Sequence, residues 1–314
     1  MGKVNLGRHI VPSVCPFRDD GEIDEAGLRQ HLRYLASVRG IGAVAFNLYA
    51  GEVHSLSREE RLRVLDIGVR ELGGKVPVIC GVQPIPDTTR EAIAFAKEAA
   101  ARGADALLLM GPAWFAFGAN TVPGVAVSYA HAVLDAVDRP FMIFQLPKWT
   151  GAHYTLDNLQ AICANPNVVG VKIVTWDTDE FESTARMLHA LPHRPRAYTG
   201  NDTTFLYNFL GGADGTLLGY NNVAVEIVIA IYDAVQSGDF LAAMDLQRRQ
   251  EPLVRVLFAE PPMLYRSRYK YAAAHLGRFP NPRMRAPLPD VDERDAKAIR
   301  RALATADLLV PVPA

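Results

Sequence analysis

The feature that most constrains the fold is a regular alternation of short apolar segments with amphipathic ones. Eight apolar runs recur at intervals of roughly 20–35 residues, which is the spacing of β-strands that alternate with α-helices. Nearly all of them lack a polar face, as do strands of a parallel sheet that is covered on both sides. The runs are residues 9–17, 43–49, 76–82, 106–112, 140–147, 168–175, 196–201 and 215–222, and the seventh is the least apolar.

The segments between these runs have the period and the capping residues of helices. Leu28, Leu32 and Leu35 are spaced by four and three residues, and Ser57 with Glu60 matches a capping box. One helix-to-strand junction, with glycine where the helix should end, occurs three times. Its copies are "RGIGAVAF" (39–46), "RGADALLLM" (102–110) and "GGADGTLLG" (211–219).

Eight such βα units predict an α/β fold, a (β/α)8 TIM barrel. The competing fold is a doubly wound sheet, but no Gly-x-Gly-x-x-Gly follows the first strand, so a dinucleotide-binding fold is disfavoured. Beyond residue 238 the strand pattern stops, and segments 240–260, 261–277 and 292–309 have helical patterns. We therefore expect a barrel over residues 1–237 and a C-terminal three-helix extension over 238–314, which serves packing or assembly rather than forming a second catalytic domain.

Composition excludes several classes of partner. The formal net charge is −1 and no long run of like charge occurs, so nothing indicates a nucleic-acid partner. The three cysteines are scattered, and the histidines lack metal-ligand spacing, so we expect neither disulfides nor a metal site. No apolar stretch reaches the roughly 18 residues of a membrane span, and no signal-peptide pattern precedes the first strand, which favours the cytoplasm and no membrane partner.

Lys172 is the residue that the pattern does not explain. It stands in "VVGVKIVT" (168–175), among β-branched residues, where an unpaired ammonium group is costly. Strand alternation places it on the face of Gly170 and Val174, and none of the predicted strands contains an acidic partner. Desolvation inside a barrel lowers a lysine pKa and supplies neutral amine, which can attack a ketone to form a Schiff base.

Loops after other strands offer groups that could hold a substrate. Ala50, Gly51 and Glu52 follow the second strand, where backbone N–H groups could turn toward an anion and the glutamate could shape the loop. Lys148, after the fifth strand, is a possible carboxylate ligand. The amides that follow the last two strands could orient a hydroxylated chain, and they are Asn201, Asn221 and Asn222.

Over essentially its whole length the chain resembles the dihydrodipicolinate synthase / N-acetylneuraminate lyase family of class I, pyruvate-type aldolases. The resemblance rests on "PFRDDGEID", "AGEVHSLSREER", "VPVICGV", "FQLPKWTG" and "GVKIVTWD", together with two of the junction repeats. It implies that Lys172 forms the Schiff base with a 2-oxo acid, that no metal or organic cofactor is needed, and that the protein is a homo-oligomer, either a dimer or a tetramer.

The sequence also departs from the family pattern at polar positions of the site. The resemblance places Phe144 where the family has its catalytic tyrosine, and a phenyl ring cannot carry a proton. Trp149 stands where dihydrodipicolinate synthase has a substrate-binding arginine, and Trp114 lies near a tyrosine that is commonly lent across the subunit interface. Tyr49 replaces a threonine of the Gly-Thr-Thr-Gly-Glu loop, and we hypothesise that its phenol supplies the missing acid–base group.

These observations predict a lyase that acts on a 2-oxo acid such as pyruvate or a sugar-derived keto acid. Lys172 captures the oxo acid as an iminium, which supports cleavage, dehydration or deamination at the neighbouring carbon. Two alternatives remain: a dihydrodipicolinate synthase with an altered proton relay, and a degenerate member that binds an oxo acid without turnover.

Overall fold

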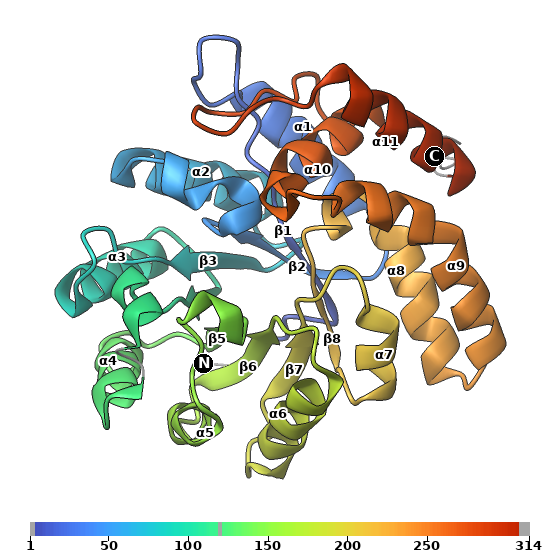
Figure 1. Cartoon of the computed structure of the whole chain (residues 1–314). Coiled ribbons are helices and arrows are strands. Elements are labelled where there is room, and N and C mark those ends of the chain that lie inside the picture. Colours follow the sequence, from blue (N-terminus) through green and yellow to red (C-terminus); the bar gives the residue numbers. More distant parts are fainter. Residues whose placement is uncertain (1–3, 119–120, 308–314) are drawn as a thin grey trace.

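The computed structural model describes residues 4–118 and 121–307 of the chain. Eight parallel strands close into one barrel in the order β1 to β8, and β1 pairs with β8 (Figure 1). This confirms the predicted (β/α)8 architecture, including the weak seventh strand. The strands are β1 His9–Pro12, β2 Ile41–Phe46, β3 Val78–Val82, β4 Ala106–Leu109, β5 Phe141–Gln145, β6 Val168–Ile173, β7 Arg196–Thr199 and β8 Gly215–Leu217.

Several apolar runs extend beyond their strands, because their last residues form the loops at the C-terminal end of the barrel. These loops contain short 3-10 turns, among them η1 Tyr49–Gly51, η3 Ala113–Phe117 and η5 Lys148–Thr150. In a barrel of this kind, catalytic groups come from these loops and from the strand ends that carry them.

Helices follow the strands and cover the barrel from outside (Figure 1). The capping box at Ser57 and Glu60 is present and starts α2. The three junction repeats also behave as predicted, because Gly40, Gly103 and Gly212 adopt φ values of +103°, +100° and +97°, which glycine reaches without steric cost. The helices are α1 Glu25–Ser37, α2 Arg58–Leu72, α3 Thr89–Ala101, α4 Val125–Leu134, α5 Leu156–Cys163, α6 Thr178–Ala190, α7 Phe205–Leu210 and α8 Asn221–Gln236.

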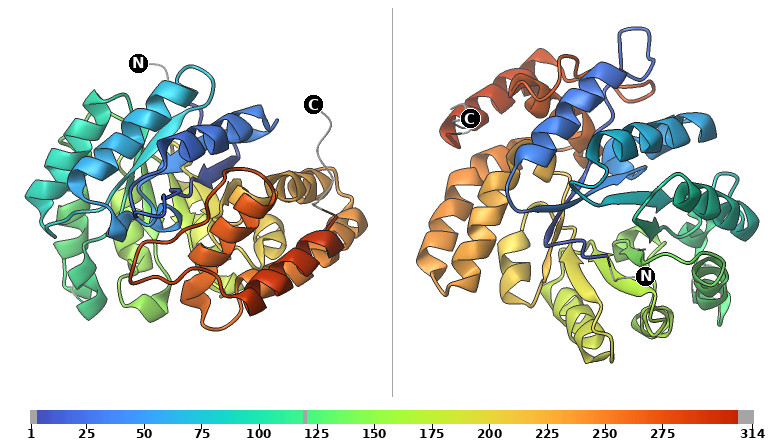
Figure 2. Two further views of the ribbon diagram at one scale, coloured as in Figure 1. Left: turned by 90° about the horizontal axis from the view of Figure 1, so that it is seen from above. Right: turned by 180° about the vertical axis from the view of Figure 1, so that it is seen from behind.

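The C-terminal extension consists of α9 Phe240–Leu257, α10 Tyr265–His275 and α11 Glu293–Thr305, as the helical patterns predict. Figure 2 shows these helices packed together on one flank of the barrel, beside α8. Apolar side chains of all three helices belong to the same buried core as the strands. The extension is therefore continuous with the barrel core, and the domain boundary at residue 237 remains a prediction.

Helix length and the placement of potential metal ligands bear on possible partners. None of the helices in residues 4–118 and 121–307 combines the length and the apolarity that crossing a bilayer requires. Within the same ranges, no cluster of three or more histidine, cysteine, aspartate or glutamate side chains is arranged to hold a metal ion.

Candidate active site

Lys172 lies near the C-terminal end of β6, in register with Phe144 on β5 and Tyr198 on β7. Its amine nitrogen Nζ is 4.3 Å from the centroid of the Phe144 ring. On the β7 side, Gly200 leaves room for the lysine chain, because a Cβ atom there would come within 2.9 Å of Lys172 Cε. Lys172 is only 8 % exposed. The structure thus shelters this amine from water, as the sequence predicts.

Burial changes the protonation of Lys172. Desolvation lowers its pKa from 10.5 to about 8, and the charge of Asp202 partly opposes that shift. At pH 7.5 a pKa of about 8 leaves about a quarter of the amine neutral, whereas an ordinary lysine would be about 0.1 % neutral. Part of this amine is therefore neutral, which is the form that Schiff-base formation requires.

Asp202 is the acidic neighbour of Lys172 that the sequence analysis missed, because it lies in a loop and not in one of the predicted strands. It follows β7 in the segment "GND" (200–202), directly after Asn201. Its Oδ1 atom accepts a hydrogen bond of 2.7 Å from the backbone N–H of Tyr220. Burial raises the pKa of Asp202 to about 6, against the opposing effects of that hydrogen bond, of Lys172 and of the Tyr269 hydroxyl.

Three tyrosines surround this carboxylate: Tyr220, which precedes α8, and Tyr265 and Tyr269 of α10. Burial, assisted by the charge of Asp202, raises the pKa of each phenol, and that of Tyr265 reaches about 12. The C-terminal extension therefore supplies part of the wall around Asp202. Sequence reasoning missed this contribution because helical periodicity does not indicate which end of a barrel a later helix covers.

The loop after β2 has the close backbone approach that its glycine indicates. A Cβ atom at Gly51 would lie 2.8 Å from the carbonyl oxygen of Ser13, so the loop packs directly against the chain that follows β1. The N–H groups of Gly51 and Glu52 donate to the carbonyls of Leu48 and Tyr49. Among the hydrogen bonds of the described residues, none uses the N–H of Ala50, which remains able to donate.

Glu52 is engaged within the protein, and its expected role as a substrate-binding residue stays a prediction. The glutamate is buried and forms an ion pair with Lys270 of α10, with 2.5 Å between Oε1 and Nζ. Lys270 also donates to the carbonyl of Arg283 at 2.8 Å. A buried charge of either sign is tolerated when it is paired in this way. Glu52 thus holds the loop in shape, which is the second function that the sequence suggested for it.

Tyr49 lies against the ring that covers Lys172. Its ring centroid is 5.5 Å from that of Phe144 and 5.1 Å from that of His54, on which it stacks. Arg266 of α10 donates from Nε to the Tyr49 carbonyl oxygen at 2.8 Å. Burial raises the pKa of the Tyr49 phenol. The structure brings Tyr49 next to Phe144, and its acid–base role stays a prediction.

Three residues of the loops after β4 and β5 that the sequence analysis names have exposed side chains: Trp114, Lys148 and Trp149. Lys148 is exposed and lies 3.5 Å from the carboxylate of Glu180. Trp149 is 78 % exposed, and Trp114 on η3 is 41 % exposed. Their roles as substrate or interface residues are not decided by contacts within one chain and stay predictions.

The amides predicted to orient a hydroxylated substrate are used within the protein. Asn201 donates to the carbonyl of Thr175 at 2.7 Å and to the hydroxyl of Thr204 at 2.6 Å, and its Oδ1 atom accepts from the same loop. Asn221 is fully buried and donates to the Ile10 carbonyl at 2.9 Å, which ties α8 to β1. Each amide has its NH2 group engaged within the protein, whereas the Oδ1 atom of Asn221 has no partner among the described residues, and both binding roles stay predictions.

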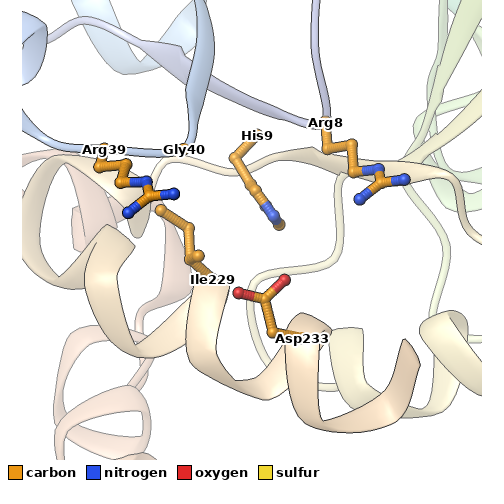
Figure 3. Close-up of a pocket in the computed structure, with 6 residues that line it drawn as sticks. All are labelled: Arg8, His9, Arg39, Gly40, Ile229 and Asp233. Carbon is orange, nitrogen blue, oxygen red and sulfur yellow. The ribbon is translucent and has the colours of Figure 1, made fainter. Parts of the chain in front are cut away.

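A separate hollow of about 400 Å³ lies at the opposite, N-terminal end of the barrel. Figure 3 shows the His9 ring between two arginines, with a carboxylate facing them from α8. Burial and the neighbouring Arg8 lower the pKa of His9 to about 4, so this imidazole is neutral at physiological pH. The hollow is lined by Arg8, His9, Arg39, Gly40, Ile229 and Asp233.

Comparisons with known proteins agree with this geometry. The model of the dihydrodipicolinate synthetase family matches residues 5–306. The 4-hydroxy-tetrahydrodipicolinate synthase of Symbiobacterium thermophilum is 31 % identical over 308 residues, which cover 97 % of this chain and 99 % of that protein. The enzyme of the same description from Methylobacterium radiotolerans is 33 % identical over 304 residues, which cover 96 % of each chain.

A solved structure has the same architecture. The dihydrodipicolinate synthase from Acinetobacter baumannii, crystallised with pyruvate, is 26 % identical and superposes with a TM-score of 0.83, covering 96 % of this chain and 99 % of that one. The family match spans nearly the whole length, and both the barrel and its C-terminal helices are shared. This chain therefore belongs to the dihydrodipicolinate synthetase family, and it is a lyase of the class I aldolase type.

Proposed function

We propose that the protein cleaves a hydroxylated 2-oxo acid through a Schiff base on Lys172. The observation that carries the proposal is the state of this amine: it is buried, it has no ion-pair partner among the described residues, and its pKa is about 8. The neutral amine adds to the ketone carbon, and loss of water gives an iminium. The iminium then accepts the electron pair of the bond that breaks at the adjacent carbon.

The backbone around Gly51 is suited to hold the carboxylate of the oxo acid. The Ala50 N–H has no partner among the described residues, and the ion pair between Glu52 and Lys270 fixes the loop that presents it. A backbone donor binds a carboxylate through a charge-assisted hydrogen bond, which is stronger than a neutral one. Lys148, exposed at the same end of the barrel, would attract the anion to the opening.

A second candidate function is dihydrodipicolinate synthase itself, favoured by the printed activity of the relatives at 31 % and 33 % identity. Phe144 and Trp149 argue against it, because they place apolar surface where the family resemblance implies a proton relay and a carboxylate-binding arginine. The Phe144 ring beside Lys172 would suit a substrate with a less polar distal part. We therefore rank the aldol cleavage of another hydroxylated 2-oxo acid above lysine biosynthesis.

We also propose that the chain forms a homo-oligomer. Trp114 and Phe117 of η3 are 41 % and 93 % exposed, which is unusual for large apolar side chains that lie so close together in the chain. A second copy of the chain that packs on η3 would bury them beside the opening of the barrel.

The central experiment is reductive trapping. The protein is incubated with pyruvate or 2-oxobutyrate, reduced with borohydride and digested, and mass spectrometry locates the label. We expect the label on Lys172 and none in Lys172→Met. Labelling without release of an aldehyde from any hydroxylated 2-oxo acid would favour a binding protein without turnover. Turnover with aspartate semialdehyde in a coupled assay would favour dihydrodipicolinate synthase.

A further inference from the structure

The proposed mechanism needs a group that moves protons beside the iminium, and the residue in the family tyrosine position cannot do so. Phe144 covers Lys172 Nζ at 4.3 Å from its ring centroid and has no ionisable atom. Cleavage of a 4-hydroxy-2-oxo acid requires a base for the 4-hydroxyl proton and an acid that protonates carbon 3 of the resulting enamine. A side chain near Lys172 other than Phe144 must therefore perform both steps.

The loop after β7 brings a carboxylate near enough to the amine for the two charges to interact. Gly200 packs against the lysine chain so closely that a Cβ atom there would meet Lys172 Cε at 2.9 Å. Asp202 follows two residues later, and the Tyr220 N–H fixes its Oδ1 atom at 2.7 Å. The carboxylate and the amine influence each other's charge, yet they form no ion pair within the described chain. No ion pair therefore holds the two groups together, and Asp202 follows β7, on the side of Lys172 that is opposite Phe144 of β5.

The other ionisable groups around the carboxylate suit a different role. Tyr220 and Tyr269 are buried and Tyr265 is partly buried, and the pKa of each phenol lies above its ordinary value, so a phenolate is costly there. Each can donate a hydrogen bond without giving up its proton. Among the described residues, Asp202 is the acid whose charge acts on Lys172, and it is the group beside the amine that ionises within the physiological range.

We propose that Asp202 is the acid–base residue of this enzyme, and that it replaces the family tyrosine from the opposite side of Lys172. This inference rests on the proposed Schiff-base function. In cleavage, the Asp202 carboxylate takes the proton of the substrate 4-hydroxyl, the C3–C4 electron pair moves into the iminium, and an aldehyde and an enamine result. The protonated Asp202 then returns the proton to carbon 3, and water releases the 2-oxo acid from Lys172.

The protonation state of Asp202 supports this cycle. A carboxyl group with a pKa of about 6 is mostly ionised at pH 7.5, so it starts as a base, and it holds a proton more readily than an ordinary aspartate does. The groups that face it are Lys172 from β6, Tyr220 from the start of α8, and Tyr265 and Tyr269 from α10. Of these groups, Lys172 has the pKa closest to 7, at about 8.

The test uses the half-reaction with pyruvate, so the natural substrate need not be known. In heavy water, the base exchanges the carbon 3 protons of the iminium for deuterium, and proton NMR follows the loss of the methyl signal. We expect Asp202→Asn to lower the exchange rate about 10²–10⁴-fold, the usual contribution of general acid–base catalysis, while borohydride still labels Lys172. Asp202→Glu should recover part of the rate, because it retains a carboxylate. Asp179→Asn, at an exposed acid of α6 on the same end of the barrel, is the matched control and should exchange at the wild-type rate.

Each remaining outcome has one meaning. Exchange by Asp202→Asn at a rate within threefold of wild type would overturn the assignment. Loss of Lys172 labelling in an Asp202→Asn variant whose thermal unfolding is unchanged would also overturn it, because Asp202 would then act in forming the iminium. A wild-type protein that is labelled but does not exchange would also overturn it. If no 2-oxo acid labels wild-type Lys172, the proposed function itself fails, which the labelling arm detects separately.

Discussion

Glu52 and Lys270 meet in a buried ion pair that joins the loop after β2 to α10, across a separation of 218 residues in the chain. The carboxylate and the ammonium group are both shielded from water, and Lys270 Nζ also lies 4.2 Å from the centroid of the Phe17 ring. Burial lowers the pKa of Lys270, and the charge of Glu52 opposes that shift. The pair thus links the C-terminal extension to the loop that presents the Ala50 N–H.

Removing one member of this pair should destabilise the protein strongly. Glu52→Gln leaves an unpaired buried ammonium group, and we expect a loss of about 3–5 kcal/mol in the free energy of unfolding. Urea denaturation followed by circular dichroism measures the change. The double variant Glu52→Gln/Lys270→Met has no unpaired charge and should recover part of the loss. A single variant as stable as wild type would contradict a buried, paired arrangement.

The rate of Lys172 labelling should follow the pKa of the amine. Only the neutral form attacks a ketone, and the pKa is about 8, so the rate of iminium formation should rise with pH up to about 8 and then level off. A solvated lysine would continue to gain reactivity up to about pH 10.5. Rapid-quench labelling with pyruvate between pH 6 and 10 measures this dependence. A midpoint above pH 10 would show that burial does not tune the amine.

Tyr49→Phe separates the two candidates for the acid–base group. Because Asp202 is assigned that role, removing the Tyr49 hydroxyl should change the deuterium exchange of pyruvate by less than threefold. The ring itself packs on Phe144 and His54, so replacing it with phenylalanine preserves these contacts. A hundredfold loss of exchange in this variant would transfer the role from Asp202 to Tyr49.

Gly51→Ala should weaken substrate binding more than it weakens folding. The new methyl group would lie 2.8 Å from the Ser13 carbonyl oxygen, so the loop must move and carry the Ala50 N–H with it. We expect the concentration of pyruvate that gives half-maximal labelling to rise at least tenfold, since about 1.4 kcal/mol of lost binding has that effect. Ala50→Gly keeps the N–H group and serves as the control, for which we expect less than a threefold change.

Phe117→Asp should disrupt self-association if η3 lies in the interface between copies. The side chain is 93 % exposed in one chain, so a charge there should not disturb the folded monomer. Analytical ultracentrifugation should show an oligomer for the wild type and a smaller species for the variant. Leu241→Asp, at a side chain of α9 that is 78 % exposed, tests whether any apolar-to-charged change has the same effect. A wild-type monomer would contradict the proposed assembly.

The barrel and its lysine are predictable from the sequence alone. Both can be read locally: the junction glycines recur at the same place in the βα unit, and Lys172 is conspicuous because a charged residue interrupts a β-branched strand. The family resemblance also placed Phe144, at the position of the family tyrosine, and the structure puts it directly opposite Lys172.

The side chains around that lysine become known only once the chain is folded. Asp202 comes from another loop, and Tyr269, which interacts with the Asp202 carboxylate, comes from a helix nearly 100 residues further along the chain. Asn201 and Glu52 have residue types suited to binding a substrate, but hydrogen bonds within the protein occupy them. Whether a polar side chain can bind a substrate depends on whether its hydrogen bonds are already made inside the protein. These hydrogen bonds join segments that are distant in the chain, and local periodicity does not encode them.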